Sequence, residues 1–267
     1  MTTTLFKETI VKQHMPDDEY RSYPAISQSE LKHMLKSPAH YKANKESVHE
    51  ETDAMRLGTA THLAVFQLEH FHNEVALAPK FDKRTKDGKA GWEKFQQENS
   101  NKILLTEEDY AKCIGMADSV RSSARFQSYI SSGSPEVSFF SKTSYGIDVK
   151  GRLDWINFKT GTALDLKTLG KEASEYEIKK TIRSRLYDFQ NGFYNNFLKS
   201  AYPDQPFNFI FIFVESSAPH GVRFVTIDPA HLLNVDALID LSLRDLKKAN
   251  ETGIFTSYNE DVNVISF

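Results

Sequence analysis

The residues best suited to joint chemistry lie in two short segments, GRLDWI and ALDLKT. Asp165 and Lys167 are two positions apart, so on a β-strand they project to the same face while Leu166 points the other way. A hairpin through residues 159–162 folds the preceding strand back and allows Asp154 to lie beside Asp165. The sequence therefore predicts two carboxylates and an ammonium group together at one end of a sheet.

Such a cluster requires a cation, because two neighbouring carboxylates repel each other and one of them acquires a raised pKa. Mg²⁺, which Mn²⁺ can replace, prefers oxygen ligands and keeps coordinated water for a substrate. This chemistry activates water and polarises a phosphoryl oxygen, and Lys167 is predicted to orient the water or offset transition-state charge. Alone, ALDLKT is more typical of a solvated ion pair; the upstream GRLDWI favours a hydrolytic centre.

The whole chain has the composition of an ordinary globular protein: 267 residues, 40% hydrophobic, 26% charged, with a net charge of −3. The acidic balance excludes no DNA enzyme, because carboxylates that hold cations can coexist with basic residues along the strand. The single cysteine, Cys113, excludes an internal disulfide, a cysteine-based zinc site and an iron–sulfur cluster. Neither a secretory leader nor an apolar run near the ~20 residues of a bilayer span is found, so a cytoplasmic protein without membrane contact is expected.

The pattern along the chain predicts an extended arm over residues 1–25 and a single α/β domain over 26–267, with a helical N-terminal part. Ser27 and Glu30 form a capping-box pattern, and Ser37-Pro38 restarts a helix. From Pro135 on, β-branched and aromatic residues predict an antiparallel meander within a central mixed sheet flanked by helices. Helices are predicted over 51–71, 89–99, 106–131, 172–183, 186–200 and from Pro229, and strands over 136–144, 147–158, 162–168, PFNFIFIFVES and GVRFVTID.

With Asp154 upstream, the Asp165-Leu166-Lys167 triplet resembles the core motif of the PD-(D/E)xK nuclease superfamily. Five segments follow the order seen in the RecE-type exonucleases (exodeoxyribonuclease VIII) of phages and prophages: LGTATH, PEVSFF, KGRLDWI, LDLKT and YDFQNGFY. ISQSELKHMLKSPAHYK also resembles the N-terminal helix of that group, so the likeness covers most of the chain. It implies a PD-(D/E)xK nuclease core.

The resemblance also implies a catalytic and metal-binding set made up of His62, Asp154, Asp165, the carbonyl of Leu166 and Lys167. His62 lies among small and apolar residues, where a lone histidine is otherwise more typical of a satisfied core residue. Glu136 opens the first strand of the meander and is predicted to be an outer metal ligand or a base behind the ligands; a solvated glutamate is the alternative.

Two further groups are predicted to support the site or bind DNA. Gln190 and Tyr194 are four apart and share one helix face; related nucleases use such a pair behind the active site and against the DNA backbone, and a simple packing edge is the alternative. The basic segment 80–89, followed by Trp92, is predicted to grip phosphates, although such a loop is usually just solvated. Its predicted DNA-binding residues are Lys83, Arg84, Lys86 and Lys89.

The activity implied by the resemblance is exonucleolytic degradation of linear double-stranded DNA from the 5′ end, leaving 3′ overhangs for recombination. A ring-shaped homo-oligomer such as a tetramer, and a RecT-type single-strand annealing partner, follow from the same source. The alternatives are an endonuclease or the nuclease module of a repair helicase, for which no GxxxxGK[ST] motif is present. A non-catalytic DNA-end-binding protein is disfavoured, because Asp154, Asp165 and Lys167 are all retained.

Overall fold

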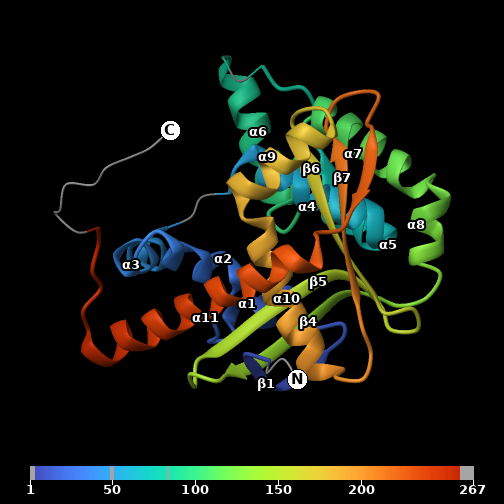
Figure 1. Cartoon of the computed structure of the whole chain (residues 1–267). Coiled ribbons are helices and arrows are strands. Elements are labelled where there is room, and N and C mark those ends of the chain that lie inside the picture. Colours follow the sequence, from blue (N-terminus) through green and yellow to red (C-terminus); the bar gives the residue numbers. More distant parts are fainter. Residues whose placement is uncertain (1–3, 49–50, 83, 259–267) are drawn as a thin grey trace.

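The computed structural model of the chain describes residues 4–48, 51–82 and 84–258. Within these residues, six strands form one mixed sheet in the order β1-β4-β5-β6-β7-β8, and helices cover both of its faces (Figure 1). Neighbouring strands are antiparallel except β6 and β7, which are parallel. The strands are β1 (Phe6–Lys12), β4 (Ser134–Thr143), β5 (Asp148–Asn157), β6 (Thr162–Leu169), β7 (Asn208–Glu215) and β8 (Val222–Val225).

Strands β4, β5 and β6 form the predicted antiparallel meander. Gly146 and Gly161 lie in its two connections with φ of 78° and 63°, a backbone conformation that strains other residues. A Cβ atom on Gly161 would also come within 2.4 Å of the carbonyl oxygen of Pro206. These glycines permit the two tight reversals, and the second of them carries the chain from Asp154 back to Asp165.

Strand β7 carries the continuous apolar run that predicted a central strand, and it pairs with β6 along its whole length. Its Phe209, Phe211 and Phe213 belong to one hydrophobic cluster, while its aliphatic side chains belong to another on the opposite face. Parallel pairing requires a crossover, which is supplied by α9 (Glu175–Arg185) and α10 (Tyr187–Ala201). The predicted strand and both predicted helices are confirmed.

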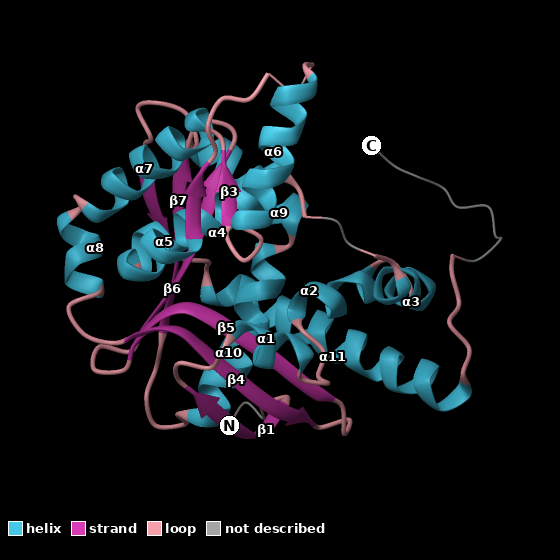
Figure 2. Cartoon of the chain, turned by 180° about the vertical axis from the view of Figure 1, so that it is seen from behind, coloured by secondary structure: helices cyan, strands magenta, loops and turns pink. Residues whose placement is uncertain are grey.

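Each face of the sheet is covered by its own helical layer, as the front and rear views show (Figures 1 and 2). Helices α10 and α11 (Pro229–Thr252) pack on the face that carries the phenylalanines of β7. The other layer comprises α4 (Asp53–Phe66), α5 (Leu68–Glu74), α7 (Glu107–Arg121) and α8 (Ala124–Tyr129). Between α5 and α7 in the sequence lie α6 (Lys86–Glu98) and two short strands that pair in parallel, β2 (Val75–Leu77) and β3 (Ile103–Leu105). In the described part of the chain, no helix combines the length and the apolarity that a bilayer crossing needs.

The N-terminal segment is more closely integrated than an extended arm would be. Residues 6–12 form β1 at the edge of the sheet, where Phe6 is fully buried against Phe193 and Phe197 of α10. The predicted capping box of Ser27 and Glu30 is present. The short helices of this region are α1 (Asp17–Ser22), α2 (Gln28–Leu31), the 3-10 helix η1 (Lys32–Leu35) and α3 (Pro38–Glu46).

Two long helices predicted from the sequence are each divided in the structure. The helix expected over 51–71 is two helices, α4 and α5, joined at Gln67, whose φ of −141° and ψ of 62° are not helical. The helix expected over 106–131 is divided into α7 and α8, because the Ser123 side chain accepts a hydrogen bond from the backbone N–H of Phe126 and begins a new helix. Neither break contains glycine or proline, so the usual sequence signal of a break is missing.

Candidate active site

Three acidic residues, Glu136, Asp154 and Asp165, lie on neighbouring strands of the meander and form an acidic row. The residues before and after Glu136 in β4 pair with the residues after and before Asp154 in β5, so Glu136 lies opposite Asp154. Pairing of β5 with β6 ends at Trp155 and Leu164, so Asp154 and Asp165 take the next position, where the two strands separate. The structure therefore brings together the two carboxylates that the sequence predicted to be neighbours.

The carboxylate of Asp154 occupies the point at which the strands separate. Its Oδ2 accepts a hydrogen bond of 2.6 Å from the backbone N–H of Leu166 and lies 3.1 Å from Nδ1 of His62. His62 comes from α4, in the layer of helices on the other side of the sheet from α10. Helix α4 thus delivers the imidazole to the acidic row, and His62 is not a core histidine satisfied elsewhere.

Asp165 and Lys167 share a face of β6, as the strand alternation predicted. Asp165 is 2% exposed, and its Oδ1 lies 2.5 Å from Nζ of Lys167. Its Oδ2 accepts a hydrogen bond of 2.6 Å from Nε2 of Gln190, which comes from α10. The same Lys167 nitrogen lies 4.7 Å from the centre of the Tyr187 ring. Both charged groups are therefore held by side chains of α10.

Burial and the neighbouring charges together set the pKa values of the carboxyl groups in this cluster. Burial and the neighbouring Asp154 raise the pKa of Asp165, even though Lys167 acts to lower it. Burial and Asp154 also raise the pKa of Glu136. Burial acts to raise the pKa of Asp154 too, but His62 and Lys167 outweigh it and lower that pKa. Two of the three carboxyl groups, Glu136 and Asp165, thus hold protons more firmly than usual.

The chemistry of these donors fits a hard divalent cation. Nδ1 of His62 and Oδ2 of Asp154 are 3.1 Å apart. Adjacent ligand atoms of an octahedral ion with bonds of ~2.1 Å are about that far apart, roughly 3 Å. A cation would also favour the charged forms of Glu136 and Asp165, whose pKa values are raised. Among the residues that the structure describes, no group of three or more His, Cys, Asp and Glu side chains converges on one position, and Asp165 is paired with Lys167.

Comparison with known proteins agrees with this arrangement. A family model described as "PDDEXK-like domain of unknown function (DUF3799)" matches residues 27–266. The chain belongs to this PDDEXK-like family. A solved structure from Eubacterium rectale, described as a "putative exonuclease", shares the fold with a TM-score of 0.64 and 12% sequence identity, over 91% of this chain and 89% of that one. No curated protein matches the sequence.

The family match places the chain among PDDEXK-like domains, and the solved structure shows that the fold is shared. The shared fold is the predicted one, a mixed sheet with an antiparallel meander and flanking helices. The family match and the shared fold do not single out the RecE type, and the roles of individual residues rest on the geometry around the acidic row.

Gln190 and Tyr194 of α10 form hydrogen bonds with residues of the candidate site. Both are buried, at 5% and 7% exposed. Gln190 donates to Asp165, and the Tyr194 hydroxyl donates at 2.9 Å to the carbonyl oxygen of Arg152, two residues before Asp154. The predicted supporting role agrees with these contacts, and the predicted contact with DNA stays a prediction.

Arg152 is a neighbour of the acidic row that was missed in the sequence. Its guanidinium lies 3.7 Å from the Glu136 carboxylate and 3.1 Å from that of Asp17, and it stacks over the Tyr20 ring at 4.0 Å. Glu136 itself has a φ of 50°, unusual for a residue with a side chain. The available signal was the position of Arg152 in GRLDWI, two residues before Asp154 and therefore on the same strand face.

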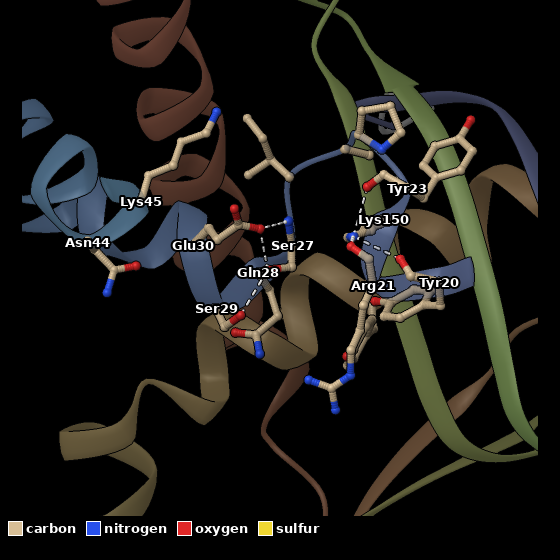
Figure 3. Close-up of a pocket in the computed structure, with 14 residues that line it drawn as sticks. Tyr20, Arg21, Tyr23, Ser27, Gln28, Ser29, Glu30, Asn44, Lys45 and Lys150 are labelled. Atoms are coloured by element: carbon tan, nitrogen blue, oxygen red, sulfur yellow. Dashed lines mark hydrogen bonds between the residues drawn. The ribbon is translucent and has the colours of Figure 1, made fainter. Parts of the chain in front are cut away.

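A cavity of about 780 Å³ lies between the N-terminal helices and β5, and its lining does not include the residues of the acidic row (Figure 3). Lys150 of β5 anchors its wall: Nζ donates hydrogen bonds of 2.9 Å to the carbonyl oxygens of Tyr20, Arg21 and Tyr23. Tyr194 also lines the cavity, so the cavity reaches the strand that carries Asp154. Its lining combines aromatic, basic and polar side chains, among them Tyr20, Arg21, Tyr23, Gln28, Lys45 and Tyr194.

The predicted basic segment runs into the first turn of α6. Arg84 is exposed and forms an ion pair with Asp82 at 2.9 Å. Lys86 and Lys89 are exposed in the first turn of α6. Lys83 lies outside the described residues. No ion pair links these described basic side chains to the predicted active-site residues, so a grip on DNA remains a prediction for them.

Proposed function

We propose that this protein is a metal-dependent exodeoxyribonuclease that hydrolyses phosphodiester bonds of linear double-stranded DNA. The observation that carries the proposal is the meeting of Asp154, Asp165 and Lys167 where β5 and β6 separate. Membership of the PDDEXK-like family and the fold shared with a "putative exonuclease" support it.

The proposed metal is Mg²⁺, with Mn²⁺ as a substitute, and its proposed ligands are His62, Asp154, Asp165 and the carbonyl oxygen of Leu166. When bound, the ion activates water and polarises the scissile phosphate. The spacing of Nδ1 of His62 and Oδ2 of Asp154, 3.1 Å, and the raised pKa of Asp165 support this assignment.

Lys167 acts in this proposal as an ammonium group. Burial acts to lower its pKa, but Asp165 and Asp154 outweigh burial and raise it, so the group keeps its proton. During hydrolysis the water oxygen bonds to phosphorus, a phosphorus–oxygen ester bond breaks, and the departing oxygen takes up a proton. Lys167 orients the water and offsets the added negative charge. Glu136 is proposed as an outer ligand or as the base that accepts the proton of the water.

The finer features of the proposal rest on the resemblance to RecE-type exonucleases. They are 5′-to-3′ polarity, 3′ overhangs left for recombination by strand annealing, a ring-shaped homo-oligomer such as a tetramer, and a RecT-type annealing partner. The cavity beside β5 gives limited support for strand binding, because aromatic rings and basic side chains are the groups that hold unpaired nucleotides.

The proposal is tested with linear duplexes labelled at either the 5′ or the 3′ end, and with a closed circle, each with and without Mg²⁺. We expect early release of the 5′ label as mononucleotide, late release of the 3′ label, an intact circle, and no release without Mg²⁺. Cleavage of the circle would assign an endonuclease instead. A protein that hydrolyses none of these substrates with either Mg²⁺ or Mn²⁺ would contradict the proposed hydrolase.

A further inference from the structure

Tyr187, the first residue of α10, lies with its aromatic ring beside the ammonium group of Lys167. The distance from Nζ to the ring centre is 4.7 Å, which is within the range of a cation–π interaction. The Lys167 side chain is only 16% exposed, and loss of water makes such an interaction stronger. The ammonium group is therefore held by two partners, the Asp165 carboxylate and the Tyr187 ring.

The Tyr187 ring is itself held in place by the sheet. It stacks on Phe211 at 5.8 Å between ring centres and contacts Phe213 at 6.2 Å. Both phenylalanines are fully buried on β7, and the parallel register pairs them with Asp165 and Lys167 of β6. The ring is thus fixed against the neighbouring strand at the level of the acidic and basic pair.

The backbone before Tyr187 is strained in a way that sets the start of α10. Leu186 has a φ of 57° and a ψ of 45°, and it both ends α9 and precedes α10. A left-handed conformation is unfavourable for a residue with a side chain and persists where the surroundings require it. Here it begins a helix on which Tyr187 and Gln190, three residues apart, contact Lys167 and Asp165 respectively.

We propose that Tyr187 is a positioning residue that holds the Lys167 ammonium toward the reacting phosphate through the face of its ring. The inference rests on the proposed function, because Lys167 has a catalytic role only in a nuclease. The contact made by the ring face does not require the hydroxyl, so phenylalanine is able to replace tyrosine at this position and leucine is not.

The kinetic test compares Tyr187→Phe and Tyr187→Leu in the full chain, with linear duplex DNA and Mg²⁺. Tyr202→Leu is the matched control, since Tyr202 packs on Phe158 and Phe207 beyond the end of α10. We expect Tyr187→Leu to lower kcat about tenfold, as loss of ~1.4 kcal/mol would, with KM nearly unchanged. Tyr187→Phe and Tyr202→Leu should keep the wild-type kcat. A loss of kcat in Tyr187→Phe as large as the loss in Tyr187→Leu would overturn the proposal.

A second measurement decides the same point without DNA cleavage. The side-chain resonances of Lys167, assigned with a Lys167→Arg variant, should be displaced by the Tyr187 ring in the metal-free protein. The displacement should persist in Tyr187→Phe and disappear in Tyr187→Leu. Unchanged resonances in a folded Tyr187→Leu protein would reject the contact. If the wild type released no nucleotides, the nuclease proposal would fail, while these spectra would still decide whether the ring holds Lys167.

Discussion

Lys167 carries the positive charge closest to the buried carboxylates, and its ammonium form determines what it can do. A protonated amine has no lone pair for a metal, so Lys167 is not expected to be a ligand. Its contacts with Asp165 and the Tyr187 ring hold the charge in one place. A group of this kind contributes to the reaction step more than to metal binding.

The first prediction separates these two contributions. Lys167→Ala should bind Mn²⁺ within a few-fold of wild type, as measured by calorimetry, yet hydrolyse DNA on the order of a hundredfold more slowly. Lys171→Ala is the control, because Lys171 forms only an exposed pair with Glu177. Loss of Mn²⁺ binding in Lys167→Ala would contradict the assigned role.

At the residue scale, local spacing allowed part of the site to be predicted. Strand alternation and one hairpin were enough to bring Asp154, Asp165 and Lys167 together. Strand alternation placed Arg152 on the face of Asp154, but its contacts with Asp17 and Tyr20, and the Tyr187 contact, depend on how other segments pack against β5 and β6. Arg152 contacts the segment around α1, and Tyr187 depends on the unusual backbone of Leu186.

Helix α6 is the element whose role in DNA binding can be tested separately. Lys86 and Lys89 in its first turn are exposed and make no ion pair within the described part of the chain, whereas Arg84 pairs with Asp82. The two lysines are therefore better placed than Arg84 to contact phosphates.

The second prediction concerns the salt dependence of DNA binding. The double variant Lys86→Ala, Lys89→Ala should reduce the slope of log Kd against log salt concentration by up to about 2, the value for two lost phosphate contacts. Lys247→Ala, Lys248→Ala makes the same change in charge at the far end of α11 and should have a smaller effect. An unchanged slope for the α6 variant would mean that its lysines are merely solvated.

Whether a segment is a helix or a strand could be predicted where the apolar periodicity was strong. The residues at which these elements begin and end could not. The meander and β7 were predicted because their β-branched and aromatic runs are continuous. The break at Gln67 and the strand formed by residues 6–12 were missed. The strand depends on tertiary contacts, such as the burial of Phe6 against α10, and the break at Gln67 contains neither glycine nor proline.

Across the whole molecule, the acidic row joins the two layers that flank the sheet. His62 belongs to the α4 layer, whereas Gln190 belongs to α10 on the opposite face. A cation held by His62 of α4 and by the carboxylates of β5 and β6 would bind the folded chain and not the unfolded one. Metal binding should therefore stabilise the whole fold.

The third prediction is a rise in unfolding temperature with Mn²⁺. At a free concentration of about 100 times Kd, binding contributes ~2.7 kcal/mol to the free energy of unfolding. For a domain of this size, that corresponds to a rise of roughly 5–10 °C, measured by calorimetry. An Asp154→Asn variant should lose most of the rise. A wild-type unfolding temperature that does not respond to Mn²⁺ would contradict the proposed metal site.

The most direct test of the hydrolytic centre is the effect of Asp165→Asn on Mg²⁺-dependent nucleotide release from linear duplex DNA. Asparagine keeps the shape and can still accept the hydrogen bond from Gln190, so circular dichroism should show an intact fold. We predict a loss of at least about a hundredfold in rate, because the variant lacks a carboxylate at the proposed metal site. A folded Asp165→Asn protein that releases nucleotides at the wild-type rate would contradict the account.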